Sequence, residues 1–207
     1  MIQIDKTSVM NLDGAIRGAR NPMNSWAKSD SYYDENGKFV LGPVDIDFGH
    51  RLAVSGSDHR KFLRQVFVTV DITAPLYWWK EFDTYKVGTV ANSCSTMHKI
   101  HAKAFDRDDF SHDRLDEGGL ALLDATVAYL EAERQKFIAN KEDRQPWHNM
   151  IQMLPSSYNQ MRTVTLNYEN LINIYYARRN HKLAEWHTLC DWILTLPFAA
   201  EWICIKD

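Results

Sequence analysis

Apolar residues recur at helical spacing in two parts of the second half of the chain. Between Leu115 and Asn140 they fall three, four or seven positions apart and predict one long amphipathic helix: Leu120, Leu123, Val127, Leu130 and Phe137. A second pattern of this kind begins at Leu183 and is stopped by Pro197, because proline cannot continue a helix. The remaining segment, 198–205, is apolar, and we expect it to pack rather than to form a free tail.

The first half of the chain carries the clearest strand. Residues 66–72 read Val-Phe-Val-Thr-Val-Asp-Ile, a β-branched and aromatic run that favours a strand. A short aromatic helix over 76–82 is expected directly after it, with Thr73 as its cap and Pro75 in its first turn. Asn36-Gly37, between aromatic and β-branched residues, predicts a hairpin.

The segment before this strand gives weaker signals. Residues 8–31 mix glycine, alanine and asparagine with Arg17 and Arg20, and we expect a solvated turn there in preference to a phosphate site. A short helix is expected over 48–54, ended by Gly56.

The stretch Leu154–Arg178 is rich in apolar and aromatic residues and carries Asn167, Asn173 and Arg178 among its polar ones. We interpret its pattern as a buried helix, in which polar groups need partners. Asn167 and Arg178 are eleven residues apart, about three turns, and would share one side, with Asn173 on a flank. Such a wall of amides and a guanidinium suits a flat, anionic or heteroaromatic ligand. In the alternative interpretation the asparagines bond to neighbouring backbone and Arg178 only faces the helix dipole.

Composition indicates an ordinary globular protein. The chain has 207 residues, of which 45% are hydrophobic and 25% charged, so it can bury a core, and we expect a single domain over residues 1–207. The formal net charge of −3 disfavours a nucleic-acid-binding protein, since an anionic ligand would need a local basic pocket.

The distribution of apolar residues and cysteines bears on the cellular compartment. No run of eighteen apolar residues occurs, which disfavours a membrane protein, and residues 1–6 lack a secretory pattern. Cys94, Cys190 and Cys204 form no CxxC pair and are odd in number, which is typical of a reduced chain. We therefore expect a cytoplasmic protein.

A Leu-Pro pair followed by two asparagines and an arginine recurs in a known family. Leu154-Pro155 precedes Asn167 by about a dozen residues, Asn173 follows six later, and Arg178 five beyond that. This spacing resembles the C-terminal part of the flavin-dependent thymidylate synthases. The resemblance implies an α+β fold, a single domain with a central, mostly antiparallel sheet flanked by long helices.

The resemblance also implies site residues. Asn167 and Asn173 would contact FAD, as would His59, which stands a few residues before the long strand. Arg178 would meet the pyrimidine nucleotide dUMP near the flavin and act as the catalytic residue, by stabilising negative charge on the pyrimidine. Lys86 would add a cation for the cofactor.

The loop that defines the family is much altered in this chain. Its Arg-His-Arg triplet is replaced by Asp83, Thr84 and Tyr85. Ser93 keeps the serine that would line the nucleotide site, and Ser95 stands where the last arginine is expected. Most of the cations that would hold a nucleotide phosphate are therefore missing, and each such contact is worth about 1.5–3 kcal/mol.

Other cations would have to replace them. A shift of one residue brings Lys86 to the third place of the triplet and Thr96 to the last arginine, while Ile151 takes the place of a further arginine before Leu-Pro. Lys86 itself, Arg162 and Arg179 are the candidates to supply the missing charge.

The implied reaction is the reductive methylation of dUMP to dTMP, with methylenetetrahydrofolate as carbon donor and NADPH as reductant of FAD. The resemblance implies a homo-oligomer, with a tetramer favoured. One alternative is a homologue that binds flavin or nucleotide but has lost catalysis. Another is a pyrimidine enzyme that uses Cys94 as nucleophile with His98 as its partner. His98 and the acidic residues that follow it lack the spacing of a metal site, and we expect no metal.

Overall fold

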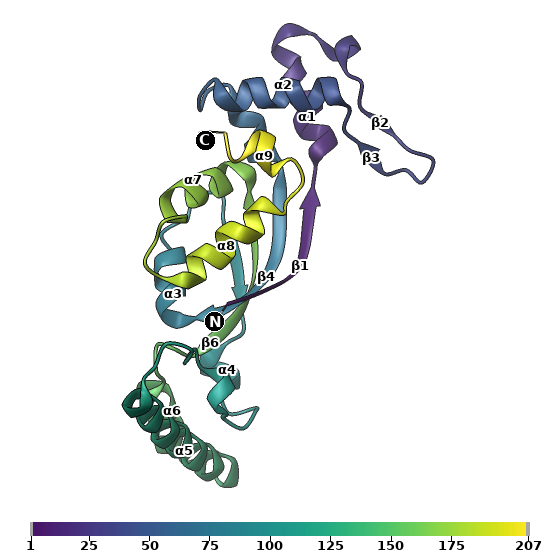
Figure 1. The fold of residues 1–207 in the computed structure, drawn as a ribbon. Helices are drawn as coiled ribbons and strands as arrows, with labels where there is room; N and C mark the ends of the chain where they lie inside the picture. Colours follow the sequence, from purple (N-terminus) through teal and green to yellow (C-terminus); the bar gives the residue numbers. More distant parts are fainter. Residues whose placement is uncertain (1, 206–207) are drawn as a thin grey trace. The chain divides into compact units, whose positions relative to one another are not determined.

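The structure is a computed structural model and describes residues 2–205. A four-stranded sheet has the order β1-β4-β6-β5, and β2 and β3 form a separate hairpin (Figure 1). The strands are β1 Gln3–Met10, β2 Tyr32–Tyr33, β3 Phe39–Val40, β4 Phe67–Pro75, β5 Val90–Ser93 and β6 Asn159–Asn167.

Helices make up most of the remaining secondary structure in the described part. The α-helices are α1 Leu12–Arg20, α2 Pro43–Val54, α3 Leu76–Phe82, α4 Thr96–Lys99, α5 Glu117–Ala139, α6 Gln145–Met153, α7 Tyr168–Arg178, α8 Ala184–Leu194 and α9 Ala199–Trp202. Four short 3-10 helices are η1 Asn21–Met23, η2 Trp26–Lys28, η3 Arg60–Gln65 and η4 Arg107–Asp109.

The two central strands run antiparallel. The hydroxyls of Thr69 and Thr165 lie 2.8 Å apart, and two residues along, Thr163 donates to Asp71 over 2.6 Å. Advancing along β4 therefore means going back along β6, which is the antiparallel arrangement. The expected α+β class, with a mostly antiparallel sheet and several helices, is confirmed.

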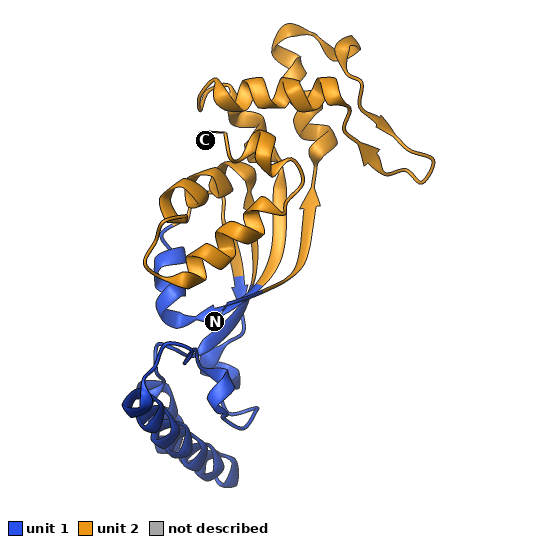
Figure 2. Cartoon of the chain, in the orientation of Figure 1, with its two compact units in different colours: residues 1–3, 72–84, 92–162 blue, residues 4–71, 85–91, 163–207 orange. Residues whose placement is uncertain are grey.

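The described residues fall into two compact units, coloured separately in Figure 2. Unit 1 holds residues 2–3, 72–84 and 92–162, and unit 2 holds 4–71, 85–91 and 163–205. We describe each unit by itself.

Unit 1 is built around the paired helices α5 and α6. Its core joins the inner face of α5 to α6 and to the segment before α5, through Ile100, Phe105, Phe110, Leu123, Leu130, Phe137 and Met150. Glu133 is buried on this face, where Asn149 of α6 donates to its carboxylate over 2.7 Å and Lys136 over 2.6 Å. Buried carboxylates require such partners, so this contact fixes how α6 packs on α5.

Unit 2 packs helices α7, α8 and α9 with α1, α2 and η3. Trp202 of α9 is fully buried and donates to the carbonyl of Ile46 over 3.1 Å. Gly49 of α2 permits this contact, because a Cβ there would lie 2.6 Å from Trp202 Nε1. The expectation that the C-terminal segment packs is confirmed for its described part.

The long helix α5, the helix α8, the strand β4, the helix α3 and the hairpin β2–β3 confirm the sequence-based predictions. The hairpin closes with Gly37 at φ 72°. One detail is wrong: β4 extends through Thr73 to Pro75, and Pro75 is itself the N-cap of α3.

The prediction of one buried helix within Leu154–Arg178 is wrong. Residues up to Asn167 form strand β6, and only Tyr168–Arg178 is helical. The alternation Thr163-Val164-Thr165-Leu166 buries only Val164 and Leu166 over that stretch, which is the period of a strand.

The prediction of a solvated turn over residues 8–31 is also wrong. This segment contains the end of β1 and helix α1, and the guanidinium of Arg20 is buried against Asp45. Helix α2 begins at Pro43, earlier than expected, so that Asp45 lies within it as this partner. A partner 25 residues away gives no local sequence signal.

Candidate functional site

Helix α7 of unit 2 begins at an asparagine pair. The side chain of Asn167 accepts from the backbone N–H of Asn170 over 3.0 Å, and Asn170 Oδ1 accepts from the N–H of Asn167 over 3.1 Å. This reciprocal capping satisfies two backbone donors at the helix start. Asn167, a predicted FAD ligand, is thus buried, and its side-chain oxygen Oδ1 already accepts a hydrogen bond from Asn170.

The loop 85–91 lies along α7. Asn170 Nδ2 donates to the carbonyl of Val87 over 2.7 Å. Gly88 follows at φ 74°, and a Cβ there would lie 2.8 Å from Asn167 Nδ2. Only glycine allows both this conformation and this close approach. The capping pair therefore also anchors the loop.

Arg178, at the other end of α7, is held by two aromatic side chains. Its Nε donates to the hydroxyl of Tyr85 over 2.8 Å, and its guanidinium lies 4.5 Å from the ring centroid of Trp186. The ring of Tyr85 lies 5.6 Å from the same guanidinium. Guanidinium planes stack favourably on aromatic faces, so the side chain of Arg178 has a defined orientation.

The same loop thus meets both ends of α7, at Asn167 and at Arg178. The sequence pattern predicted these two residues on one side of a single helix. Asn167 is instead the last residue of β6, and α7 begins at Tyr168. The structure instead relates them through the loop 85–91, which contacts both.

His59 lies in a different part of unit 2, at a pocket between α1, α2 and η3. The turn that presents it depends on Gly56 at φ 103°, whose carbonyl accepts from the N–H groups of His59 and Arg60 over 3.1 Å. The pocket has a volume of about 620 Å³. Its lining is mostly apolar, with a few polar groups: Gly18, Ala19, Asn21, Pro22, Met23, Phe48, Leu52, Asp58, His59, Lys61, Phe62 and Gln65.

Pockets that bind cofactors commonly have this size and this mixture of apolar walls and few polar groups. Phe48 offers aromatic surface, Phe62 is a buried part of the wall, and Lys61 and Asp58 bring one cation and one carboxylate beside His59. The apolar walls fit a flat ring system, and Lys61 is the cation that a phosphate could meet.

Comparison with known proteins bears on the fold. No protein-family model and no curated protein sequence matches the chain. Among solved structures, thymidylate synthase X from Helicobacter pylori, solved with FAD and dUMP, has a TM-score of 0.69 at 17% identity and covers 100% of both chains. The chain has the fold of a flavin-dependent thymidylate synthase. A UMP/dUMP methylase from Streptomyces cacaoi, bound to 5-Br dUMP, matches with a TM-score of 0.61 at 12% identity over 97% of this chain and 94% of that one.

The other predicted residues of unit 2 lie on its surface. Lys86 is exposed in the loop 85–91, next to Tyr85. Asn173 is exposed on α7, on the side away from its buried residues Leu171, Ile172 and Ile174. Unit 2 therefore joins Lys86 with Asn167 and Arg178 through one loop and one helix, while His59 lines its own pocket.

The two predicted substrate-binding serines belong to unit 1. Ser93 is exposed on β5, and Ser95 caps the short helix α4 by accepting from the N–H of His98 over 3.1 Å. Strand β5 is continued by a backbone bond from Cys94 to the carbonyl of Met161 over 2.9 Å.

Two of the candidate replacement cations are already paired. Arg162 donates to Asp83 over 2.8 Å and lies 4.3 Å from the ring centroid of Trp79 in unit 1. Arg179 lies over Tyr175 and Tyr176 of unit 2, 5.6 and 5.0 Å from their centroids. The aspartate that replaces the first arginine of the family triplet thus neutralises one of the candidates.

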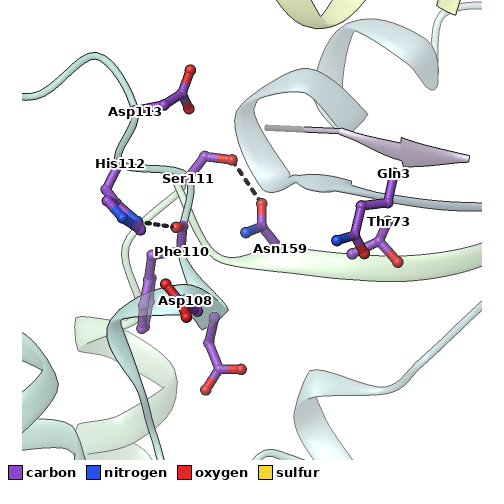
Figure 3. Close-up of a pocket in the computed structure, with 9 residues that line it drawn as sticks. Gln3, Thr73, Asp108, Phe110, Ser111, His112, Asp113 and Asn159 are labelled. Atoms are coloured by element: carbon purple, nitrogen blue, oxygen red, sulfur yellow. Dashed lines mark hydrogen bonds between the residues drawn. The ribbon is translucent and has the colours of Figure 1, made fainter. Parts of the chain in front are cut away.

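A second pocket, lined mainly by polar residues, lies within unit 1 and has a volume of about 440 Å³ (Figure 3). Ser111 donates to Asn159 Oδ1 over 2.8 Å at its wall, and His112 Nδ1 lies 2.8 Å from the carbonyl oxygen of Phe110. Asp108, Asp109 and Asp113 also line it. Asp109 is already paired with Lys103 over 2.6 Å, and the carboxylates of this pocket disfavour an anionic nucleotide there.

The cysteine alternative receives little geometric support. Cys94 is a free, exposed cysteine, and within residues 2–205 no hydrogen bond joins its sulfur to His98. The same described residues contain no group of three or more histidines, cysteines and carboxylates that could hold a metal ion. No helix in this part of the chain is both long and apolar enough to cross a membrane.

Sequence reasoning missed Tyr85, Trp186 and Asn170. Asn170 had a local signal, since Asn-x-x-Asn after an alternating run is typical of a strand that passes into a capped helix. Tyr85 and Trp186 had none, because they meet Arg178 only through the tertiary fold.

Proposed function

We propose that this chain binds FAD and a pyrimidine nucleotide and catalyses the reductive methylation of dUMP to dTMP, with methylenetetrahydrofolate and NADPH as co-substrates. The observation that carries the proposal is the fixed guanidinium of Arg178, in a chain whose whole length has the fold of an enzyme solved with FAD and dUMP.

The flavin would occupy the pocket at His59. The aromatic walls of Phe48 and Phe62 would contact the ring system, and Lys61 would face its phosphates. When bound, FAD would supply the hydride-transfer chemistry that no side chain can provide.

The nucleotide would lie at the loop 85–91 and the end of α7. Arg178 would bind the pyrimidine and stabilise the negative charge that develops on it during the reaction, because a fixed cation stabilises charge without reorganising. Lys86 would meet the phosphate from the same loop. Ser93 and Ser95, which belong to unit 1, stay predictions from the resemblance alone.

The resemblance also assigns Asn167 and Asn173 to the flavin. Asn167 caps α7 and Asn173 lies on it, and neither is at the pocket of His59, so in the proposed homo-oligomer they would supply amides to a flavin held in the pocket of another subunit.

The first test is flavin retention. We expect the purified protein to keep a visible flavin absorption band after incubation with FAD and desalting, and to oxidise NADPH faster when dUMP is added. Asn173→Ala removes an exposed amide and should weaken the band, with Asn180→Ala, another exposed asparagine, as its control. Asn167→Asp is the informative change at the cap, since a carboxylate keeps the acceptor for Asn170 and loses only the amide donor.

A second candidate function is that of a binding homologue without catalysis. It is favoured by Asp83, which replaces a family arginine and pairs with Arg162. Retention of flavin with no dUMP-dependent NADPH oxidation would select it. No flavin band at any FAD concentration would contradict both candidates.

Assembly forms a further part of the proposal. We expect a homo-oligomer, with a tetramer favoured, as the resemblance to the family implies. Light scattering coupled to size-exclusion chromatography measures the mass directly, and a monomer would contradict this part.

A further inference from the structure

At position 85 this chain has a tyrosine that contacts Arg178. In the register that the sequence favours, Tyr85 stands at the third place of the triplet that reads Arg-His-Arg in the family, and in the shifted register Lys86 takes that place. A cation is lost there, and a phenol is gained whose oxygen accepts from Arg178 Nε over 2.8 Å. The change therefore removes one nucleotide contact and adds a support for another.

Trp186 provides the second support. Its side chain is fully buried, and its backbone N–H donates to the carbonyl of Leu183 over 3.2 Å at the start of α8. The rings of Tyr85 and His181 lie edge-on to it, each with its centroid 6.1 Å away. The indole is thus a rigid surface, and the guanidinium of Arg178 rests 4.5 Å from its centroid.

Both contacts restrict the side chain of Arg178. The guanidinium lies against the ring of Trp186, 4.5 Å from its centroid, and its Nε is held by the bond to Tyr85. A long arginine side chain that is ordered before binding loses less conformational entropy when a ligand arrives. One preordered arginine can thus recover part of the affinity that the missing loop arginines would have given.

We propose that Tyr85 and Trp186 are positioning residues that hold Arg178 ready for the pyrimidine nucleotide. The inference rests on the proposed function and deepens it: in this chain, nucleotide recognition depends on one arginine clamped between a phenol and an indole. Neither Tyr85 nor Trp186 needs to touch the nucleotide.

The direct test is Tyr85→Phe, which removes the hydroxyl and keeps the ring next to Trp186. We expect the Kd for dUMP to rise about fivefold to tenfold, the size of one lost ordinary hydrogen bond, because the hydroxyl acts on the nucleotide only through Arg178. Flavin retention and the melting temperature should not change. Tyr176→Phe is the matched control, because Tyr176 lies by the neighbouring Arg179, and its Kd should equal that of the wild type.

A double-mutant cycle separates positioning from direct contact. Arg178→Ala should abolish most dUMP binding, and adding Tyr85→Phe to it should cause no further loss, because the hydroxyl acts only through the guanidinium. Trp186→Phe keeps an aromatic surface and should weaken binding by only about twofold, while Trp186→Leu should weaken it more. Additive losses of Tyr85→Phe and Arg178→Ala would overturn the positioning role.

An NMR measurement keeps this inference distinct from the proposed function. The Nε–H signal of Arg178, assigned by its disappearance in Arg178→Lys, should exchange slowly in the wild type and rapidly in Tyr85→Phe. If the wild type binds dUMP and Tyr85→Phe binds it equally well, the inference is wrong and the proposed function stands. If the wild type shows the slow signal but binds no dUMP, the proposed function is wrong, and the role assigned to the clamp fails with it.

Discussion

Two regions of unit 2 hold their candidate ligand groups in opposite ways. At the end of α7, Arg178 is enclosed by Tyr85 and Trp186, so the polar group itself is fixed. At His59 the surrounding elements are fixed, and they leave a pocket of about 620 Å³. The first arrangement suits a small anionic ligand that meets one oriented cation, and the second suits a large flat ligand that fills a space.

Different interactions stabilise the two regions. The elements around the pocket are held by Arg20, buried between Asp45 and the ring of Phe48, which itself lines the pocket. The α7 region is held by the side-chain amides of Asn167 and Asn170 and by the contacts of Arg178 with the side chains of Tyr85 and Trp186. Arg60 of η3 joins the two, since it pairs with Glu169 at the start of α7 through bonds of 3.0–3.1 Å.

The largest expected effect is a loss of stability in the pocket region when its buried ion pair is broken. Asp45→Ala leaves the guanidinium of Arg20 buried without its anion, which should lower the free energy of unfolding by about 3–5 kcal/mol. Urea denaturation measures this change. Asp47→Ala on the same helix breaks only the exposed pair with Arg51 and should cost at most about 1 kcal/mol. Equal losses in the two variants would show that the pocket region does not depend on the buried pair.

The same carboxylate gives a pH dependence. Burial alone would raise the pKa of Asp45, but hydrogen bonds from Ser29, Ser31 and Arg20 outweigh it and hold the pKa below its ordinary value of about 3.9. A depressed folded-state pKa stabilises the protein above the ordinary value, and this stabilisation is lost as the pH falls through the folded-state pKa. The stabilities of wild type and Asp45→Ala should therefore begin to converge below about pH 4 and become equal only below the folded-state pKa of Asp45.

Gly88→Ala should disturb the α7 region alone. The new Cβ would have to adopt a positive φ and would approach Asn167 Nδ2, so we expect a local cost of about 1–3 kcal/mol and weakened dUMP binding. Gly37→Ala is the matched control, since Gly37 has φ 72° but nothing within 4 Å of its Cβ position. Unchanged dUMP binding in Gly88→Ala would separate the loop from the nucleotide site.

His59→Ala tests the pocket. We expect the Kd for FAD to rise about tenfold, equivalent to about 1.4 kcal/mol, because the ring contributes contact area and a hydrogen bond. Global stability should not change, as His59 is exposed. His98→Ala, an exposed histidine of unit 1, is the control for fluorescence titration with FAD. A rise in both variants would point to a non-specific effect.

Asn170→Ala should lower the free energy of unfolding by about 1 kcal/mol, since it removes one half of the capping pair. It also removes the bond to Val87, so hydrogen exchange in the loop 85–91 should accelerate. Asp116→Ala removes the cap of α5 at similar cost and should leave that exchange unaltered. Slow exchange in Asn170→Ala would mean that other contacts anchor the loop.

Local sequence patterns predicted most of the elements but not the two sites. Helix α1 was missed because Gly14 and Gly18 weaken the helical pattern and because Asn11 begins it at φ 67°. Without α1 the pocket at His59 could not be predicted, since α1 forms one of its walls.

Arg178 was predicted by its spacing from Leu154-Pro155, whereas its supports were not. Tyr85 is 93 residues away and Trp186 follows on the next helix, so neither contact has a periodic signature. The same holds for the pairing of Arg162 with Asp83, which lies 79 residues away in the sequence.

The most direct test of the central claim is the formation of dTMP. Purified protein would be incubated with FAD, NADPH, methylenetetrahydrofolate and dUMP. The nucleotides would then be separated by chromatography and identified by mass spectrometry. We predict dTMP in the complete mixture, none when any one component is omitted, and none with Arg178→Ala. Retention of dUMP as the sole nucleotide, in a protein that binds both FAD and dUMP, would contradict the catalytic claim and leave a two-ligand binding protein.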